Sequence, residues 1–406
     1  MKRFRPLAIL LALLFALVPN GLLAAESATW ELGGHAKSLN LYREGDPAGV
    51  IDDGFDSANN LRLDLARPVG KESRFEFAVE GQVRYSDADA LGRERENTPN
   101  RRLDLEKSRG EERRFSQRGE IDRLNLSGSH SGFAWNIGRQ AIGFGRIALA
   151  SPLDIIAPFA PDALDTDVRP GIDALRAGRF FGRGGEIGAL AVFGRHKESN
   201  SYLLHGETNL AGVDLLALGG NLRGRDLLGV GFATQFMGMG IKGELAAYRG
   251  EGVGKPGGDP RKDFLQGALE LDYRFAAGPL CALQYLHNGF GAKEPEDYPA
   301  IFLSAPIQEG LGYLLGRHYL LASVSHDLHP LVTLGALGIW NLRDDSFLMR
   351  PLVRISLGDN LSLELFWSFN QGSSPKENKS IIQTIIPRSE FGAAGDGGGI
   401  LLKYFF

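Results

Sequence analysis

Apolar and polar residues alternate with a period of two along many short segments of the chain. In residues 74–85, one set of alternate positions is apolar and the other is charged or polar. The apolar set is Phe75, Phe77, Val79, Val83 and Tyr85, and the polar set is Glu76, Glu80, Gln82 and Arg84. Because successive side chains of a strand point to opposite faces, such a segment can face lipid on one side and water on the other. The alternation recurs in residues 60–66, 264–275, 350–358 and 361–370.

Short and long connections take turns between the alternating segments. The short ones are residues 128–132, 182–185, 209–212, 236–240, 276–279, 327–330 and 357–360. The long polar ones are residues 43–57, 86–118, 142–172, 250–261, 290–314 and 371–395. Soluble β-sandwiches also alternate, but short turns at one end and long loops at the other are typical of an outer-membrane barrel. Only a closed barrel lets strands cross a bilayer, since an open edge would leave backbone groups unpaired in hydrocarbon.

The pattern predicts an all-β fold, a single transmembrane antiparallel β-barrel of about 18 strands with short periplasmic turns and long extracellular loops. The strands are expected at residues 29–42, 58–67, 74–85, 119–128, 132–141, 173–181, 185–195, 199–208, 213–221, 226–235, 239–249, 263–275, 280–289, 315–326, 330–341, 347–357, 360–370 and 396–406. Charge alternation is poor in residues 199–221, and losing both strands there would leave about 16. An even count places both termini on the periplasmic side.

Residues 1–25 have the pattern of a secretory signal peptide. Basic residues at its start precede an apolar run from Leu7 to Val18, and the small residues Ala24 and Ala25 suit a signal peptidase. We therefore expect an exported chain whose barrel spans residues 26–406. No later stretch approaches the roughly 18 uncharged apolar residues that indicate a membrane-spanning helix.

The last segment predicts a strand with an aromatic final residue. Ile400, Leu402, Tyr404 and Phe406 would face lipid, and Lys403 would face the lumen. This ending resembles the C-terminal signature of Gram-negative outer-membrane proteins, in which Tyr404 and Phe406 match the aromatic positions. The resemblance implies recognition by the barrel-assembly machinery, a location in the cell outer membrane, and contact with outer-membrane lipid and lipopolysaccharide.

Composition narrows the classes of function. The single cysteine, Cys281, allows no intrachain disulfide and no haem-attachment motif. A net charge of −4 gives no reason to expect a nucleic-acid partner. The eight histidines form no H-E-x-x-H pattern, so we expect no metal site, no cofactor and no enzymatic activity.

Residues 137–181 resemble a segment of large porin-like barrels related to the alginate-export family. The matching positions are Gly138, Arg139, Gln140, Arg169, Pro170, Gly171, Asp173 and Arg176. The resemblance implies a strand end, then a proline-rich acidic loop, then a further strand. It also implies a pore with a strong excess of arginine.

The inward-facing charges depart from that excess. The basic candidates are Arg62, Arg84, Arg123, Lys242, Arg274, Arg350, Arg354 and Lys403, and the acidic ones are Asp64, Glu76, Glu80, Glu244, Glu270, Asp272 and Glu364. Because the two signs nearly cancel, the lumen would lack the single-sign field that concentrates one kind of ion. We therefore expect weak ion selectivity rather than a pore for alginate.

The loop of residues 142–172 is unusually apolar, and four prolines restrict it. Its carboxylates at Asp154, Asp162, Asp165 and Asp167 could pair with wall arginines such as Arg84, Arg123, Arg350 or Arg354. These features predict a constriction loop that folds into the barrel, with Arg139, Arg169 and Arg176 at its anchoring ends. The alternative is an exposed loop that contacts lipopolysaccharide or a neighbouring protomer.

Two functions fit this pattern. The first is a porin-like channel for passive passage of small solutes. The second is a structural barrel around a multihaem cytochrome, because the chain also resembles the barrels of porin–cytochrome electron conduits, which implies haem on a partner protein. The channel is the preferred prediction, and the sequence does not specify the solute or the oligomeric state.

Overall fold

The fold is that of a computed structural model, and it describes residues 30–45, 52–87, 99–110, 114–182, 184–378 and 384–406. The predicted signal peptide, residues 1–25, lies outside the described residues. Within the described part, no helix is long and apolar enough to cross a membrane.

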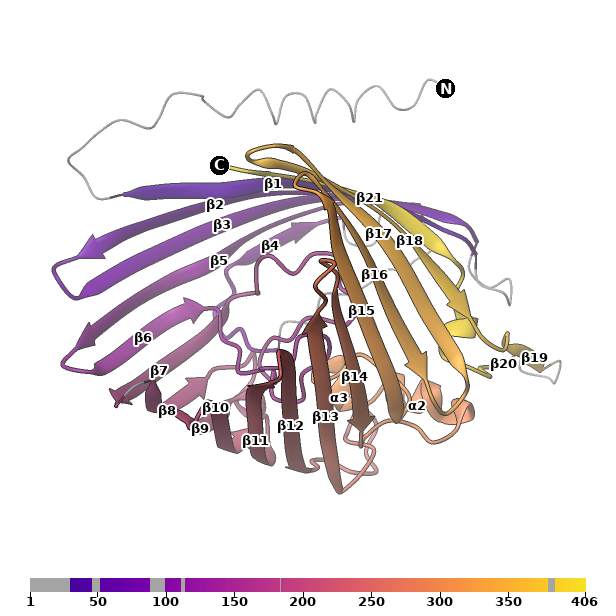
Figure 1. The fold of residues 1–406 in the computed structure, drawn as a ribbon. Coiled ribbons are helices and arrows are strands. Elements are labelled where there is room, and N and C mark those ends of the chain that lie inside the picture. The colour runs from indigo at the N-terminus through magenta and orange to yellow at the C-terminus, as the bar shows by residue number, and fades with distance from the viewer. Residues whose placement is uncertain (1–29, 46–51, 88–98, 111–113, 183, 379–383) are drawn as a thin grey trace.

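Eighteen strands form one closed antiparallel barrel (Figure 1). They are β1 (Glu31–Arg43), β2 (Gly54–Val69), β3 (Ser73–Ser86), β5 (Phe115–His130), β6 (Phe133–Gln140), β7 (Ile172–Phe181), β8 (Gly185–Val192), β9 (Ser201–Leu210), β10 (Val213–Leu222), β11 (Arg225–Phe236), β12 (Met239–Arg249), β13 (Asp263–Arg274), β14 (Leu280–Asn288), β15 (His318–His329), β16 (Val332–Asn341), β17 (Ser346–Gly358), β18 (Leu361–Gln371) and β21 (Gly397–Phe405). Each strand pairs with the next along the chain, and β21 pairs with β1 to close the ring. The predicted fold class is confirmed, and every predicted strand lies within about four residues of an observed one at each end.

The connections divide the barrel into two ends. At the short-turn end, strands join through tight turns such as residues 131–132, 211–212 and 237–238. At the long-loop end lie β4 (Glu106–Arg109), η2 (Lys197–Ser199), η3 (Pro295–Asp297), α2 (Tyr298–Phe302), α3 (Ala305–Gln308), β19 (Lys376–Asn378), β20 (Thr384–Ile386) and η4 (Phe391–Ala393). Strand β4 pairs with the part of β5 that extends beyond β6 and so continues the wall there.

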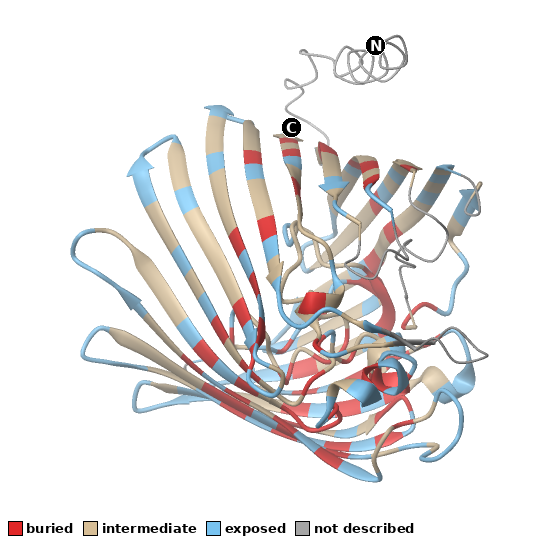
Figure 2. Cartoon of the chain, turned by 90° about the vertical axis from the view of Figure 1, so that its right-hand side faces the viewer, coloured by how far each residue is buried: buried red, intermediate tan, exposed pale blue. Residues whose placement is uncertain are grey.

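The two faces of the wall follow the alternation in the sequence. Leu63, Ile137 and Leu228 are exposed on the outward face, whereas Arg62 and Glu244 are buried on the inward face. Figure 2 shows the resulting alternation of buried and exposed residues along the strands. At the closure, Phe406 and Gly34 exchange two backbone hydrogen bonds.

Most of the core lies inside the barrel. One cluster packs the inward side chains of β7–β13 against residues 142–156 and against the connection between β14 and β15. A second cluster packs inward residues of β13–β17 against Ile147 and Leu314. The inward face of these strands is therefore apolar, and segments of the same chain cover it.

Candidate functional site

The candidate site is the segment of residues 141–171, here called the crossing segment, which joins β6 to β7. Both of its ends are fixed on the inner wall. Arg139 is 1% exposed and bonds the Asp173 carboxylate through Nε at 2.8 Å and Nη2 at 3.1 Å. The backbone N–H of Gly171 donates to Asp122 Oδ1 at 2.7 Å, and a Cβ at Gly171 would lie 1.9 Å from the Asp122 carbonyl oxygen. The second end therefore requires glycine.

The first half of the crossing segment is apolar and packs on strands β7–β13. Its buried side chains are Ile142, Phe144, Leu153, Ile155 and Ile156. Leu153 fills the space above Gly229 and Gly231, where a Cβ would come within 2.6 and 2.9 Å of its methyl groups. Burying a side chain of this size contributes about 1.5–3 kcal/mol, so this contact stabilises the docked position.

Glu244 of β12 holds the turn of this half in place. Its Oε1 accepts the backbone N–H of Ile147 at 3.0 Å and also that of Arg146. Its Oε2 accepts the Ser151 hydroxyl at 2.6 Å and the Leu153 N–H at 3.0 Å. One buried carboxylate thus satisfies four donors of the segment.

Two neighbouring strands extend this attachment. Glu270 of β13 accepts the Ala148 N–H at 3.0 Å and also pairs with Lys242 at 2.9 Å. Gln284 of β14 accepts the Ala150 N–H at 3.0 Å and donates to the Ala150 carbonyl at 2.6 Å. Side chains of three adjacent strands therefore bind consecutive backbone groups of the segment.

The second half of the segment is acidic and binds the opposite wall. Lys37 of β1 pairs with Asp165 at 2.7 Å and with Asp167 at 2.8 Å. Lys403 of β21 pairs with Asp167 at 3.0 Å and with Glu364 at 3.2 Å. In the order of the ring, β12 lies ten strands from β1 one way and eight the other, so the two halves bind opposite walls of the barrel.

The pKa values of two aspartates in the segment reflect these contacts. Burial would raise the pKa of Asp167, but hydrogen bonds from Lys37 and Lys403 outweigh it and hold the pKa below its ordinary value. Burial raises the pKa of Asp154 even though Arg169 pairs with it at 2.7 Å. Arg169 also lies over the ring of Phe159, 5.0 Å from the centroid.

One of the expected wall arginines pairs with a carboxylate of the loop, since Arg350 Nη2 lies 3.8 Å from Asp162 Oδ2. Arg350 donates to the carbonyl of Asp162, and Arg123 donates to the carbonyl of Arg169 at 2.6 Å. The other two expected wall arginines pair within the wall: Arg84 with Asp56 at 3.4 Å, and Arg354 with Glu364 at 2.9 Å. Arg176 pairs with Glu186 at 3.0 Å, also within the wall.

The main partner of the acidic half, Lys37, did not emerge from the sequence. It lies directly opposite Lys403 in the register of β1 and β21. Like charges in that position repel, so a shared anion is favourable there. Alternation alone places Lys37 inward, but nothing in the sequence indicates which carboxylates reach it.

The remaining pore-lining candidates form short ion-pair chains on the inner wall. Arg62 joins Asp122, Asp64 at 2.9 Å and Glu80 at 3.3 Å. Arg101, which the sequence did not single out, joins Glu120 at 2.6 Å and Asp122 at 3.0 Å. The other candidates also lie on inward rows: Glu76 bonds Arg74, Asp272 pairs with Lys242, and Arg274 donates to the carbonyl of Gly278.

A buried polar cluster joins the loops at the long-loop end. Glu390 accepts the Leu315 N–H and Asn341 Nδ2, both at 2.8 Å, as well as the Tyr319 hydroxyl. Its own N–H donates to Asp344 at 2.8 Å. Burial raises the pKa of Glu390 to about 7, although these donors favour the charged form.

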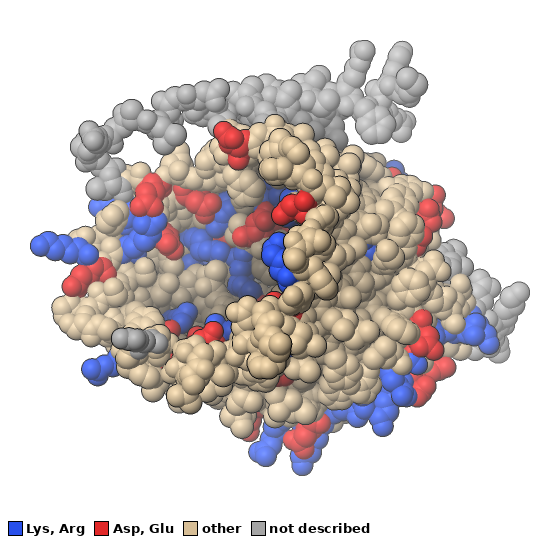
Figure 3. All heavy atoms as spheres, viewed as in Figure 1, with Lys and Arg blue, Asp and Glu red and all other residues tan. Residues whose placement is uncertain are grey.

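A hollow remains beside the crossing segment. It opens on the side of the molecule where β1–β6 lie, and acidic and basic side chains gather round it (Figure 3). Among the described residues, no group of three or more His, Cys, Asp or Glu side chains could hold a metal ion.

Comparisons with known proteins show a similarity of fold, and none of sequence family. No family model and no curated protein sequence matches the chain. Among solved structures, OccAB4 of Acinetobacter baumannii is similar at 8% identity and a TM-score of 0.59, over 94% of this chain and 99% of that one. The outer membrane protein OprD of Pseudomonas aeruginosa is similar at 10% identity and a TM-score of 0.56, over 94% and 95%. Neither comparison shows a relation to alginate-export barrels or to the barrels of porin–cytochrome conduits, so both of those resemblances stay predictions.

Proposed function

We propose that the protein is a porin-like channel of the outer membrane through which small hydrophilic solutes pass by diffusion, and that the crossing segment is its constriction. The observation that carries the proposal is the attachment of one segment to opposite walls, at Glu244 on one side and at Lys37 and Lys403 on the other. A segment that reaches from one wall to the other narrows the lumen that it crosses. The shared fold with OprD and OccAB4 supports the location.

The channel should discriminate weakly between cations and anions. The basic groups nearest the acidic half are already paired, since Lys37, Lys403 and Arg350 all contact its aspartates. Inward arginines of β2 and β5 are likewise paired with carboxylates, Arg62 with Glu80 and Arg118 with Glu120. A lumen of balanced charge lacks a field that favours one sign.

The alternative of a sheath around a multihaem cytochrome has less support. A sheath needs a lumen wide enough for a second protein, whereas here residues of this chain form two apolar clusters inside the barrel.

Planar-bilayer recording tests the proposal. The purified protein, shown to be folded by a shift in gel mobility on boiling, should give discrete conductance steps with a cation-to-anion permeability ratio near unity. The boiled sample is the control and should give none. A folded protein that does not conduct, and that co-purifies with haem, would favour the sheath.

A further inference from the structure

A groove of about 570 Å³ crosses five strands of the wall near the long-loop end. Strand register arranges most of its lining in two rows. One row is Ala36, Leu61, Gly81, Gly119 and Lys107, and the other is Ser38, Asn59, Val83, Gln117 and Arg109.

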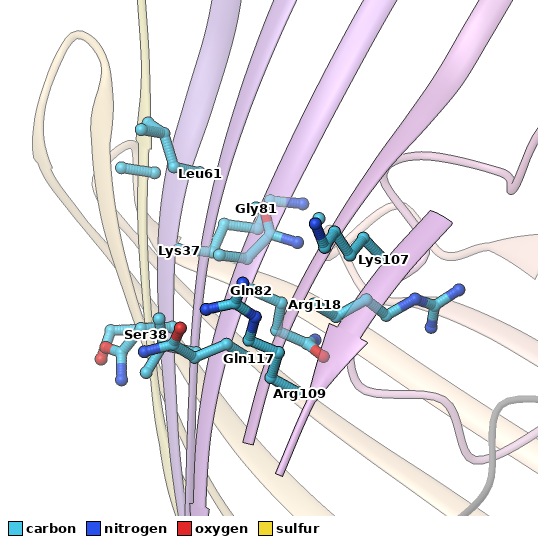
Figure 4. A pocket seen from close by; sticks show the side chains of 14 residues that line it. Lys37, Ser38, Leu61, Gly81, Gln82, Lys107, Arg109, Gln117 and Arg118 are labelled. Atoms are coloured by element: carbon cyan, nitrogen blue, oxygen red, sulfur yellow. The ribbon is translucent and has the colours of Figure 1, made fainter. Parts of the chain in front are cut away.

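The groove lies on the outward face of the barrel. Arg118, which points into the lumen, pairs there with Glu106 at 3.0 Å and Glu120 at 2.7 Å. Its neighbour Gln117 and the opposing Lys107 must then point outward, because side chains alternate across a strand. In Figure 4, Lys107 and Gln117 extend to the opposite side from Arg118.

Two glycines give the groove its depth. A Cβ at Gly81 would meet no atom within 4 Å, and at Gly119 the nearest would be 4.0 Å away. Neither glycine is needed for a close approach or has positive φ. Both positions therefore leave open space on the outward face, and a larger side chain would fill it without disturbing the wall.

The groove combines an apolar floor with two cations at its rim. Ala36, Leu61 and Val83 supply apolar surface. Lys107 and Arg109 are exposed, and among the described residues neither has a carboxylate partner. Arg109 is the last residue of β4, at the long-loop end of the wall.

We propose that this groove binds a phosphorylated membrane lipid. An acyl chain would lie along the floor over Gly81 and Gly119, and the phosphate would accept hydrogen bonds from Lys107 and Arg109. Charge-assisted contacts of this kind are about twice as strong as neutral hydrogen bonds. The place of Arg109 at the long-loop end of the wall suits a head group at the edge of a bilayer. The inference rests on the membrane location proposed above, but not on the conductance.

The residues around the groove favour a lipid over free phosphate or a second copy of this chain. Free phosphate would use the two cations but not the apolar floor. A second copy of this chain would have to present an anionic group at the same depth. The floor continues into the outward apolar face, where Leu63 is exposed, so a chain can enter the groove from the bilayer.

Native mass spectrometry of the detergent-solubilised protein tests the proposal, with phosphatidylglycerol as the probe and a diacylglycerol of the same chains as the phosphate-free comparison. Phosphatidylglycerol should bind at least about tenfold more tightly than the diacylglycerol. The double variant K107Q/R109Q and the groove-filling variant G81L should each weaken its binding by about tenfold. R249Q, which changes an exposed arginine at the same end of β12, is the matched control and should leave binding unchanged.

Several results would overturn the proposal. K107Q/R109Q could bind phosphatidylglycerol as tightly as the parent, or R249Q could weaken its binding as much as K107Q/R109Q does. Millimolar inorganic phosphate alone could also displace the lipid. A change of oligomeric state in lipid-free G81L would assign the groove to a second copy instead. Bilayer conductance of the same preparations reports separately on the channel, so failure of either proposal can be told from failure of the other.

Discussion

The two sides of the barrel interior have opposite chemistry. The charged wall, made of β1, β2, β3, β5, β17, β18 and β21, presents inward ion pairs such as Arg62 with Asp122 and Arg354 with Glu364. The apolar wall, made of β7–β14, presents inward side chains such as Leu203, Leu216 and Phe264. An interior filled with water suits the first wall and not the second.

The difference shows what positions the crossing segment. Exposed apolar surface inside the lumen is unfavourable, so the apolar wall is stable with a cover, and residues 142–156 supply it. The charged wall needs no cover, and it binds the acidic half of the segment and its end at Gly171. Docking therefore combines apolar packing with hydrogen bonds to Glu244 on one side and is ionic on the other, and the two contacts should fail under different conditions.

The largest effect is expected from removing the carboxylate that fixes the segment to the apolar wall. Glu244→Ala leaves four donors without their acceptor. Charge-assisted hydrogen bonds contribute about 1.5–3 kcal/mol each, so we expect a loss of about 4 kcal/mol in docking free energy after relaxation. The open-channel current should rise and become noisy. Glu76→Ala, on the charged wall and half-exposed, should change neither property.

A second effect should follow from a cavity under the segment. Leu153→Ala removes a fully buried side chain and should cost about 3 kcal/mol. Hydrogen exchange should then show roughly a hundredfold loss of protection in residues 147–155. Leu63→Ala changes an exposed leucine on the outer face and serves as the control. Equal loss in both variants would contradict the asymmetry between the two walls.

The loop cluster at the long-loop end should respond to pH. The pKa of Glu390 is raised to about 7 from an ordinary 4.5, so its stabilising effect is fully present below pH 4.5 and is lost as pH rises through 7. Between pH 5.5 and 8 the cluster should lose about 2 kcal/mol, or roughly thirtyfold in exchange protection of residues 311–317. Glu390→Gln should abolish this dependence, whereas Asp359→Asn in a short turn should keep it. Protection that rises with pH in the parent would be contrary to this account.

The smallest effect concerns ion selectivity. Changing both Lys37 and Lys403 to Gln leaves Asp165 and Asp167 without their lysine partners. The permeability ratio should shift toward cations by about two- to fivefold in dilute salt, and less at 1 M, where screening is strong. Lys107→Gln removes a lysine that faces away from the lumen and should not change the ratio. A shift of equal size in both variants would place the selectivity outside the constriction.

The sequence predicted the strands well because a barrel wall with one apolar outer face imposes a strict alternation on them. Outward positions are apolar along most of the wall, so alternation reveals each strand. The poor alternation of residues 199–221 is explained by the apolar wall, because β9 and β10 are apolar on both faces where the segment covers them. The poor alternation therefore reflects the covering of the inner face of β9 and β10 by the crossing segment, and not the absence of strands.

The site was less predictable, since its contacts join residues far apart in the chain. Prolines and aspartates indicated an unusual loop, but its partners Lys37 and Glu244 lie about one hundred residues or more away from it. The short helices and β4 at the long-loop end were also missed. The short helices are not strands and so have no period of two, and β4, with four residues, is too short for its alternation to be recognised.

Single-channel conductance of a variant lacking residues 150–168 tests the central claim most directly. The deletion removes the part of the crossing segment that spans the lumen, and the ring of eighteen strands keeps all of its backbone pairing. A variant that shifts on gels like the parent should conduct several times more current per channel. If it folds normally and conducts like the parent, the crossing segment is not the constriction.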